Sequence, residues 1–265
     1  METRYDVIVI GGGHAGVEAA AASARIGART LLVTPNLDGI GQMSCNPAIG
    51  GVAKGTVVRE VDALGGIMGL ATDRARIQFR MLNRSKGPAV WAPRAQCDRG
   101  LYPRAARALL ERTPALHFFQ GMVGSLVMDG GRVAGVRTES GYTFHASSVV
   151  LTAGTFLRGR IHVGLAPGVP AGRAGDAPSV RLAEQMEALG MEVARFKTGT
   201  PPRIDGRSVD YAKTEVQPGE SPEYRLSVWE RNPLLPQMPC WITWTGDELR
   251  DTVQEHLQSS ALYGG

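Results

Sequence analysis

The sequence contains few cysteines and no long apolar run. Its 265 residues include three cysteines, at positions 45, 97 and 240, and no CxxC pair. This set favours neither a disulfide framework nor a metal site, so we expect a cytoplasmic protein without a metal. No stretch approaches the roughly 20 uninterrupted apolar residues of a membrane helix, and the first residues lack the layout of a signal peptide. We therefore expect neither a membrane protein nor a secreted one.

Lysine is also scarce, because only four of the 29 basic residues are lysines. The net charge is a mild +4, but the charge is uneven along the chain. Between Asp73 and Arg112, ten basic residues stand against three acidic ones, a local charge of +7. Such a stretch could attract a phosphate backbone or an anionic cofactor, but the charge alone favours a solvated helix face.

Glycine is abundant, at 34 residues, and the first glycines stand within a strand–helix–strand pattern. Residues 6–10 are a continuous apolar run of strand length, and residues 17–26 are an alanine-rich helical segment followed by a glycine. Residues 30–34 are a second apolar run. Buried parallel strands have such runs, and a βαβ unit needs about 30 residues. The sequence therefore predicts an α/β fold with a parallel sheet.

The turn after the first strand carries the pattern Gly11-x-Gly13-x-x-Gly16. The first glycine permits a tight turn, the second lets the backbone approach a pyrophosphate, and the third allows the helix to contact the strand. The helix N-terminus then supplies amide donors to the phosphates. The NAD-binding pattern has an acid for the ribose after the second strand, but here that strand ends at Thr34 with Asn36 close by. The pattern predicts dinucleotide binding and disfavours NAD.

Further elements follow along the chain. The predicted helices cover residues 56–64, 94–112, 179–189 and 247–257. The predicted strands cover residues 116–120, 123–128, 132–138, 142–146, 148–151 and 241–244. Asp129-Gly130-Gly131 is a hairpin turn between two of these strands. We expect a dinucleotide-binding domain over residues 1–200 and the incomplete beginning of an inserted domain over residues 201–265.

The strand at residues 148–151 enters a turn of small residues, Thr152-Ala153-Gly154-Thr155. In two-dinucleotide flavoproteins such a strand packs beneath the nucleotide-binding loop, and a β excursion like residues 123–146 precedes it. These features favour FAD over NAD as the ligand of the glycine motif. The alternative is a further buried strand without a role in binding.

Residues 36–55 form a glycine-rich loop without periodicity, and a loop of this length is usually functional or disordered. Its apolar residues argue against disorder. Cys45 lies in this loop near Lys54, where backbone N–H groups and a cation could make its thiol a nucleophile. The alternative, favoured on general grounds, is an inert small apolar side chain. Cys97, in a helical pattern, and Cys240, after a proline, have the context of structural residues.

Several longer strings of the sequence resemble one family closely. They are Gly11-Gly-Gly-His-Ala-Gly16, Gly41-Gln-Met-Ser-Cys-Asn-Pro-Ala-Ile-Gly-Gly51, Glu60-Val-Asp-Ala-Leu-Gly-Gly66, Ser85-Lys-Gly-Pro-Ala-Val90, Gly172-Arg-Ala-Gly-Asp176 and Lys197-Thr-Gly-Thr-Pro-Pro-Arg203. The resemblance is to the MnmG (GidA) family, the FAD-containing subunit of the enzyme that installs carboxymethylaminomethyl groups on the tRNA wobble uridine. It runs along essentially the whole chain and favours a reactive Cys45 over an inert one.

The resemblance implies a FAD-binding, Rossmann-like domain of three layers with a parallel sheet and a β excursion. It implies a catalytic Cys45, in the Ser-Cys-Asn-Pro motif. It also implies FAD contacts at Gly11, Gly12, Gly13, His14, Ala15, Gly16, Val123 and Ser179. The modification needs a thiol, because a thiolate that adds to C6 of uracil makes C5 reactive.

The resemblance further implies NADH, methylenetetrahydrofolate, and glycine or ammonium as co-substrates. It implies tRNA as the substrate, an MnmE-type GTPase as the partner, and a homodimer. Proteins of this family are much longer and carry a second reactive cysteine, so we expect an N-terminal part that is inactive alone. The alternatives are a generic flavin oxidoreductase that acts on small molecules and a non-catalytic fragment that docks RNA or a partner.

Overall fold

The structure is a computed structural model that describes residues 3–220, 223–260 and 263. Its main sheet has six strands. They are β1 (Arg4–Ile10), β2 (Thr30–Thr34), β6 (Leu116–Gln120), β7 (Val123–Asp129), β8 (Arg132–Thr138) and β9 (Thr143–Leu151). The strand order is β6-β2-β1-β9-β8-β7, in which β6, β2, β1 and β9 are parallel neighbours. The predicted α/β fold with a parallel sheet is confirmed.

Strand β9 joins the parallel part of the sheet to an antiparallel β excursion. Residues 143–145 of β9 pair with β8, and residues 145–151 pair with β1. The predicted division into strands 142–146 and 148–151 is wrong, because one unbroken strand serves both neighbours. The predicted hairpin of β7 and β8 is confirmed, with Gly130 and Gly131 at positive φ between the two strands.

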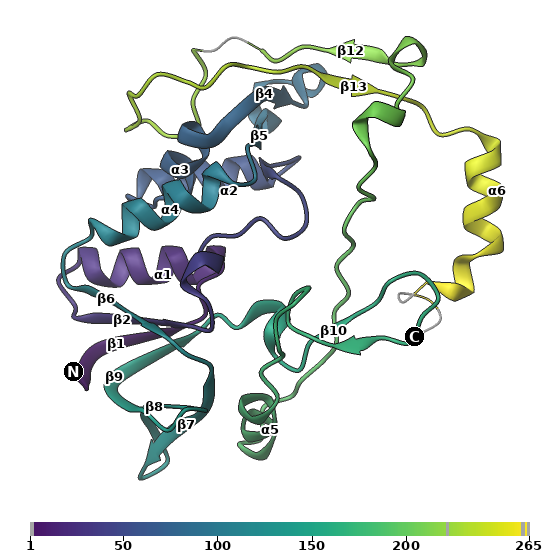
Figure 1. The fold of residues 1–265 in the computed structure, drawn as a ribbon. Coiled ribbons are helices and arrows are strands. Elements are labelled where there is room, and N and C mark those ends of the chain that lie inside the picture. Colours follow the sequence, from purple (N-terminus) through teal and green to yellow (C-terminus); the bar gives the residue numbers. More distant parts are fainter. Residues whose placement is uncertain (1–2, 221–222, 261–262, 264–265) are drawn as a thin grey trace.

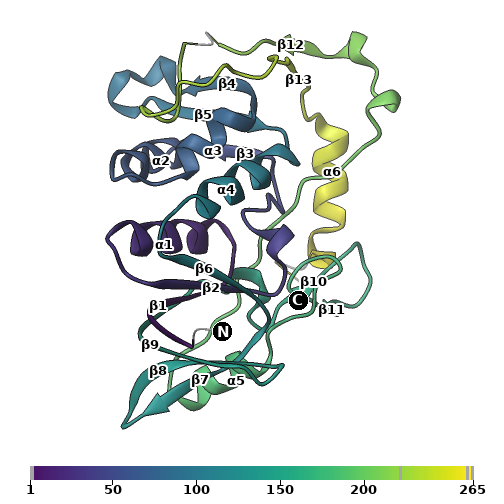
Figure 2. The same ribbon diagram turned by 60° about the vertical axis from the view of Figure 1, so that its left-hand side comes forward.

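The described residues form six α-helices. They are α1 (His14–Arg25), α2 (Lys54–Ala63), α3 (Met68–Ala75), α4 (Leu101–Glu111), α5 (Arg181–Ala188) and α6 (Asp247–Glu255). Helix α1 covers one face of the parallel strands, and the β7–β8 hairpin and α5 lie on the opposite side of these strands (Figures 1 and 2). Alternate strand residues serve the two sides, since Val9 and Leu32 pack with α1 whereas Ile8 and Leu31 pack with Phe144 of the excursion. Within the described residues, no helix has the length and apolar character needed to cross a membrane.

A smaller sheet lies beyond α1, with α2, α3 and α4 between the two sheets (Figure 2). Its strands, in the order β3-β5-β4, are β3 (Ala48–Gly50), β5 (Ala92–Cys97) and β4 (Arg76–Leu82). The predicted helix over 94–112 is wrong at residues 94–97, because these pair in β5 with both β3 and β4. Helix α4 begins at Leu101 instead, where the Asp98 carboxylate accepts hydrogen bonds from the N–H groups of Gly100 and Leu101 at 2.8 and 2.9 Å.

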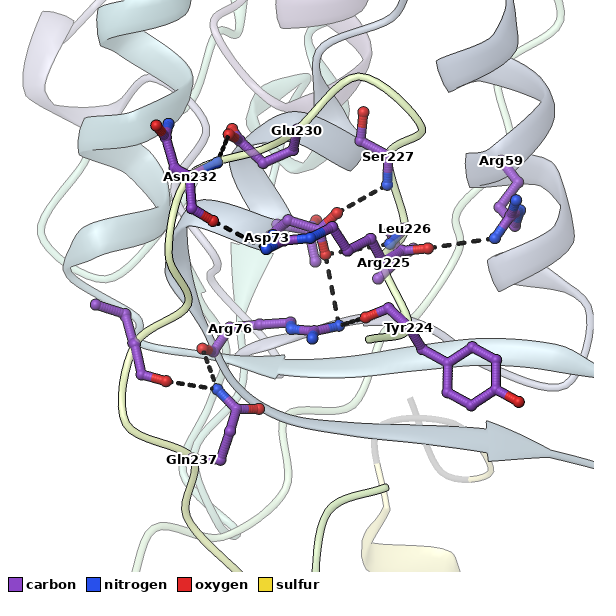
Figure 3. Close-up of polar contacts among 12 residues, drawn as sticks. Arg59, Asp73, Arg76, Tyr224, Arg225, Leu226, Ser227, Glu230, Asn232 and Gln237 are labelled. Carbon is purple, nitrogen blue, oxygen red and sulfur yellow. Dashed lines mark hydrogen bonds and ion pairs between the residues drawn. The ribbon is translucent and has the colours of Figure 1, made fainter. Parts of the chain in front are cut away.

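A later segment, residues 224–237, returns to the smaller sheet and forms hydrogen bonds with buried polar groups there (Figure 3). The buried carboxylate of Asp73 accepts hydrogen bonds from the N–H groups of Leu226 and Ser227 at 3.1 and 2.8 Å. The buried guanidinium of Arg76 lies 3.7 Å from Asp73 and donates to the carbonyl of Tyr224. Buried charges are stable only when they are paired and hydrogen-bonded, so this network depends on the returning segment.

Four short strands complete the β-strands of the described residues. They are β10 (Arg160–Ile161), β11 (Val169–Pro170), β12 (Glu215–Gln217) and β13 (Cys240–Ile242). The predicted helices at 56–64, 179–189 and 247–257 are α2, α5 and α6, with ends shifted by one or two residues, and the predicted strand at 241–244 is β13. Residues 191–205 have no regular structure and run from α5 toward β12 (Figure 1). The domain boundary near residue 200 falls within this connection and stays a prediction.

Candidate functional site

Two of the three glycines of the Gly11-x-Gly13-x-x-Gly16 pattern, which joins β1 to α1, are closely packed. Gly11 has a positive φ of 103°, and a Cβ atom on it would lie 2.5 Å from the carbonyl oxygen of Thr152. A Cβ atom on Gly16 would overlap the carbonyl oxygen of Gly11. A Cβ atom on Gly13 would meet no heavy atom within 4 Å. Packing therefore requires the first and third glycines, whereas the second borders open space.

The small-residue turn after β9 lies directly against the glycine turn. The Thr152 hydroxyl lies 2.7 Å from the carbonyl oxygen of Ile10 and 3.1 Å from that of Gly11, and donates to them. The Thr152 backbone N–H donates to the Ile10 carbonyl as well, at 2.9 Å. The predicted packing of the strand-to-turn motif against the glycine turn is therefore confirmed, and its role in nucleotide binding stays a prediction.

A cavity of about 610 Å³ lies at the carboxyl ends of β1, β2 and β9. The predicted site residues that line it are Gly11, Gly12, Gly13, His14, Cys45, Val123 and Ser179. Ala15 and Gly16, the next residues of α1, do not line it. Val123 and Ser179 are brought together, because the Ser179 hydroxyl donates to the Val123 carbonyl at 3.4 Å. The fold thus gathers residues from four separate segments around one space.

The end of β2 borders the same cavity through Thr34, Pro35 and Asn36. The side-chain oxygen of Asn36 accepts a hydrogen bond from the N–H of Asp38 at 2.8 Å, which caps a short turn. The Asp38 carboxylate lies 2.7 Å from the guanidinium of Arg107. The strand end therefore presents hydroxyl and amide groups to the cavity and no carboxylate, in agreement with the departure from the NAD-binding pattern.

Two basic side chains border the cavity near α1. Burial, and then the positive charge of Arg173, lowers the pKa of His14, whose Nδ1 atom lies 3.5 Å from the Tyr102 hydroxyl. The guanidinium of Arg173 donates to the Gln42 side chain and lies 5.4 Å from the centre of the Phe156 ring. Its Nε atom is buried and has no hydrogen-bond partner among the described residues. Neither Arg173 nor Gln42 was predicted as a site residue, although each lies in a string that carries the family resemblance.

Cys45 reaches the cavity from the loop that follows β2, and its side chain is half-buried. The thiol donates a hydrogen bond to the carbonyl of Gly199, with 2.8 Å between Sγ and the oxygen. The guanidinium of Arg203 donates to the carbonyl of Cys45. Lys54 lines the same cavity, as its closeness in sequence to Cys45 indicated.

The other two cysteines lie outside the cavity lining. Cys97 is buried at the end of β5 rather than within a helix, and burial raises the pKa of its thiol to about 12. Burial also raises the pKa of Cys240, whose Sγ atom lies 3.1 Å from the side-chain oxygen of Gln78. Thiols with a raised pKa are poor nucleophiles at neutral pH, and of the three cysteines only Cys45 lines the cavity.

The basic residues between positions 73 and 112 do not form one solvated helix face. They are distributed over α3, β4, β5, α4 and the turns between these elements, and Arg76 is fully buried. Several are neutralised by carboxylates in the pairs Arg74–Glu230, Arg84–Glu220 and Arg107–Glu111. The expected helix face is wrong because strands interrupt the helical pattern and later segments supply counter-charges.

The comparisons with known proteins agree with this geometry. Residues 6–265 match the family model described as glucose inhibited division protein A. The chain is 52% identical over its whole length to the tRNA uridine 5-carboxymethylaminomethyl modification enzyme MnmG of Phocaeicola vulgatus and covers 42% of that protein. It is 45% identical to a crystal structure of Aquifex aeolicus GidA, with a TM-score of 0.91 over 99% of this chain and 45% of that one.

A more distant structure, the GidA-related protein from Thermus thermophilus, is 26% identical, with a TM-score of 0.51 over 70% of this chain and 68% of that one. The chain spans less than half the length of the Phocaeicola and Aquifex proteins. Since the family model covers nearly every residue and the fold is shared with Aquifex GidA, the chain belongs to the GidA, or MnmG, family.

Proposed function

We propose that this chain forms the FAD-binding part of an enzyme that adds a carboxymethylaminomethyl group to C5 of the tRNA wobble uridine. Membership of the GidA family supports the proposal. So does the 52% identity to the MnmG protein, whose name describes this modification. Because the chain covers 42% of that relative, the complete activity is itself part of the proposal.

The residues around the cavity fit a dinucleotide such as FAD. Gly13 leaves open space at the N-terminus of α1, where amide groups and the helix dipole favour a pyrophosphate. Arg173 offers a cation with a free buried Nε atom to the same cavity. Thr34 and Asn36 offer polar groups to a ribose at the end of β2. When bound, FAD supplies the electron-transfer chemistry of the reaction.

The Cys45 thiol is the nucleophile in this proposal. Uracil C5 is a poor nucleophile by itself. When the thiolate adds to C6, a C–S bond forms and the electrons of the C5–C6 double bond move into an enolate that is reactive at C5. After C5 has gained its new group, loss of the C5 proton expels the thiolate and restores the ring.

The observation that carries the proposal is that one cavity joins the glycine turn to Cys45. The turn would hold the cofactor and the loop would present the thiol, so both reagents would meet a uridine in one place. The long string from Gly41 to Gly51, which carries the family resemblance, argues against a generic flavin oxidoreductase. A docking module has no need of a nucleotide-binding turn.

The substrate in this proposal is tRNA, and the partner is an MnmE-type GTPase. NADH, methylenetetrahydrofolate, and glycine or ammonium complete the reaction, which takes place in a cytoplasmic homodimer. These components are inferred from the family resemblance, whereas the residues around the cavity support FAD and the Cys45 thiol.

Two measurements test the proposal. Visible absorption after reconstitution with FAD separates a flavoprotein from a docking module. Analysis of modified nucleosides in tRNA, with the GTPase partner present, separates uridine modification from generic flavin reduction. The absence of a bound flavin spectrum at saturating FAD would contradict the cofactor assignment. Flavin turnover without modified uridine would favour the generic oxidoreductase.

A further inference from the structure

The connection at residues 191–205 contacts the Cys45 loop at two points. The Gly199 carbonyl accepts the hydrogen bond of the Cys45 thiol at 2.8 Å, and the guanidinium of Arg203 donates to the Cys45 carbonyl. Thr198 and Gly199 also line the cavity. Residues that are 154 and 158 positions away in the sequence thus hold both the side chain and the backbone of Cys45.

A stiff stretch of chain joins these two contacts. Thr200, Pro201 and Pro202 lie between Gly199 and Arg203. Proline fixes its own φ and restricts the residue before it to extended conformations, so a pair of prolines transmits a shift at one end to the other. Arg203 is exposed, so packing in the protein interior does not force its side chain against the Cys45 loop.

The contact between Cys45 and Gly199 suits the thiol and not the thiolate. Cysteine can donate a hydrogen bond to a carbonyl oxygen only as S–H, because a thiolate has no proton to donate. The thiolate is the nucleophilic form of cysteine. The hydrogen bond must therefore break before Cys45 attacks a substrate, by rotation of the thiol or by withdrawal of residues 198–203.

We propose that Arg203 is a positioning residue for Cys45. Its hydrogen bond keeps residues 198–203 against the Cys45 loop, so that the Gly199 carbonyl holds the thiol in a resting orientation. When the hydrogen bond of Arg203 breaks, the thiol is free to attack. The proposal rests on the proposed role of Cys45 in uridine modification. Arg195 provides a matched control, because it lies in the same connection but donates to the carbonyl of Arg158, at 3.4 Å.

The rate at which iodoacetamide alkylates Cys45 tests the proposal. Site-resolved mass spectrometry follows Cys45 separately from the other cysteines in protein reconstituted with FAD. Arg203→Ala should accelerate alkylation of Cys45 about fivefold, the effect expected from losing one hydrogen bond that holds the loop. Arg203→Lys keeps a donor and should restore a rate close to wild type, and Arg195→Ala should leave the rate unchanged.

An unchanged or slower rate in Arg203→Ala overturns the proposal, because the side chain would then not hold the thiol back. Equal acceleration in Arg195→Ala overturns it as well, since any variant that loosens residues 191–205 would then expose the Cys45 thiol. Cys45→Ser in the full-length protein, assayed for modified uridine, distinguishes failure of this proposal from failure of the proposed function. If Cys45→Ser is active, the role of Cys45 in the proposed function fails. If it is inactive while Arg203→Ala alkylates like wild type, only the positioning role fails.

Discussion

Gly16 lies so close to Gly11 that a Cβ atom on Gly16 would overlap the Gly11 carbonyl oxygen. The same Cβ atom would lie 2.7 Å from the hydroxyl oxygen of Thr152, which itself donates to the Gly11 carbonyl. Strand β1, helix α1 and the turn after β9 therefore meet at a point that has room only for a hydrogen atom. The geometry of the cavity depends on a residue that does not line it.

Gly16→Ala should destabilise the protein by about 2 kcal/mol, because the added methyl group overpacks this junction. The distorted turn should also weaken FAD binding. Urea denaturation measures the first effect and flavin fluorescence titration the second. Gly13→Ala is the stability control, since its Cβ atom meets no heavy atom within 4 Å. A Gly16→Ala protein as stable as Gly13→Ala would show that the junction relaxes without cost.

Gly13→Asp should abolish FAD binding and leave the secondary structure intact. Gly13 has an ordinary φ of −70°, so a side chain causes no backbone strain there. The carboxylate would enter the open space that a pyrophosphate needs and would repel its negative charge. Circular dichroism and flavin fluorescence titration of the same sample check both parts. Unchanged FAD affinity would place the pyrophosphate elsewhere.

In the full-length protein, Cys45→Ser should leave folding and FAD binding near wild type and stop uridine modification. A hydroxyl is nearly the size of a thiol, but it is not ionised near neutral pH and cannot add to the pyrimidine. Thermal stability and the yield of modified nucleoside are measured for the same variant. An inert structural cysteine would give the opposite result, with stability reduced by about 1–2 kcal/mol and activity retained in the folded fraction.

His14 should make the protein less stable in mild acid. Burial lowers its pKa, so the unfolded chain binds this proton near pH 6.5 and the folded protein only at lower pH. Its contribution to the free energy of unfolding is complete above about pH 6.5 and is lost as the pH falls through that value toward the folded pKa. His14→Gln should therefore flatten the decline in stability below about pH 6.5, as measured by urea denaturation across this range. An equally steep decline in His14→Gln would assign the acid sensitivity to other groups.

Asp73→Ala should destabilise the protein by about 3 kcal/mol, because it removes a buried counter-charge of Arg76 and the acceptor for two N–H groups. Urea denaturation gives the free energy of unfolding. Asp205→Ala is the control, since Asp205 pairs with Arg207 on the surface, and it should leave the free energy of unfolding unchanged. Equal stability of the two variants would mean that the returning segment does not depend on Asp73.

The elements predicted well are those with a strong local pattern. Strands β2, β6 and β8 have the predicted bounds, because each is a short run with apolar, aromatic or β-branched residues between turn residues. Residues 94–97 contain alanine, arginine and glutamine, which favour helix locally, but pairing with β3 and β4 makes them a strand. Helix α3 and strand β4 were not predicted, and α3 begins where the Glu18 carboxylate accepts hydrogen bonds from the N–H groups of Ile67 and Met68.

From the sequence we could predict the glycine turn, the helix that follows it, the β excursion and the Cys45 loop as a candidate site. Each of these depends on residues that are close together in the chain, such as the glycines whose lack of a side chain permits the turn. The fold was needed to show that Arg173 borders the cavity, that Arg203 donates to the Cys45 carbonyl, and that much of the basic stretch is neutralised. These contacts join distant positions, and a hydrogen bond or ion pair forms only where the folded path brings donor and acceptor within about 3 Å.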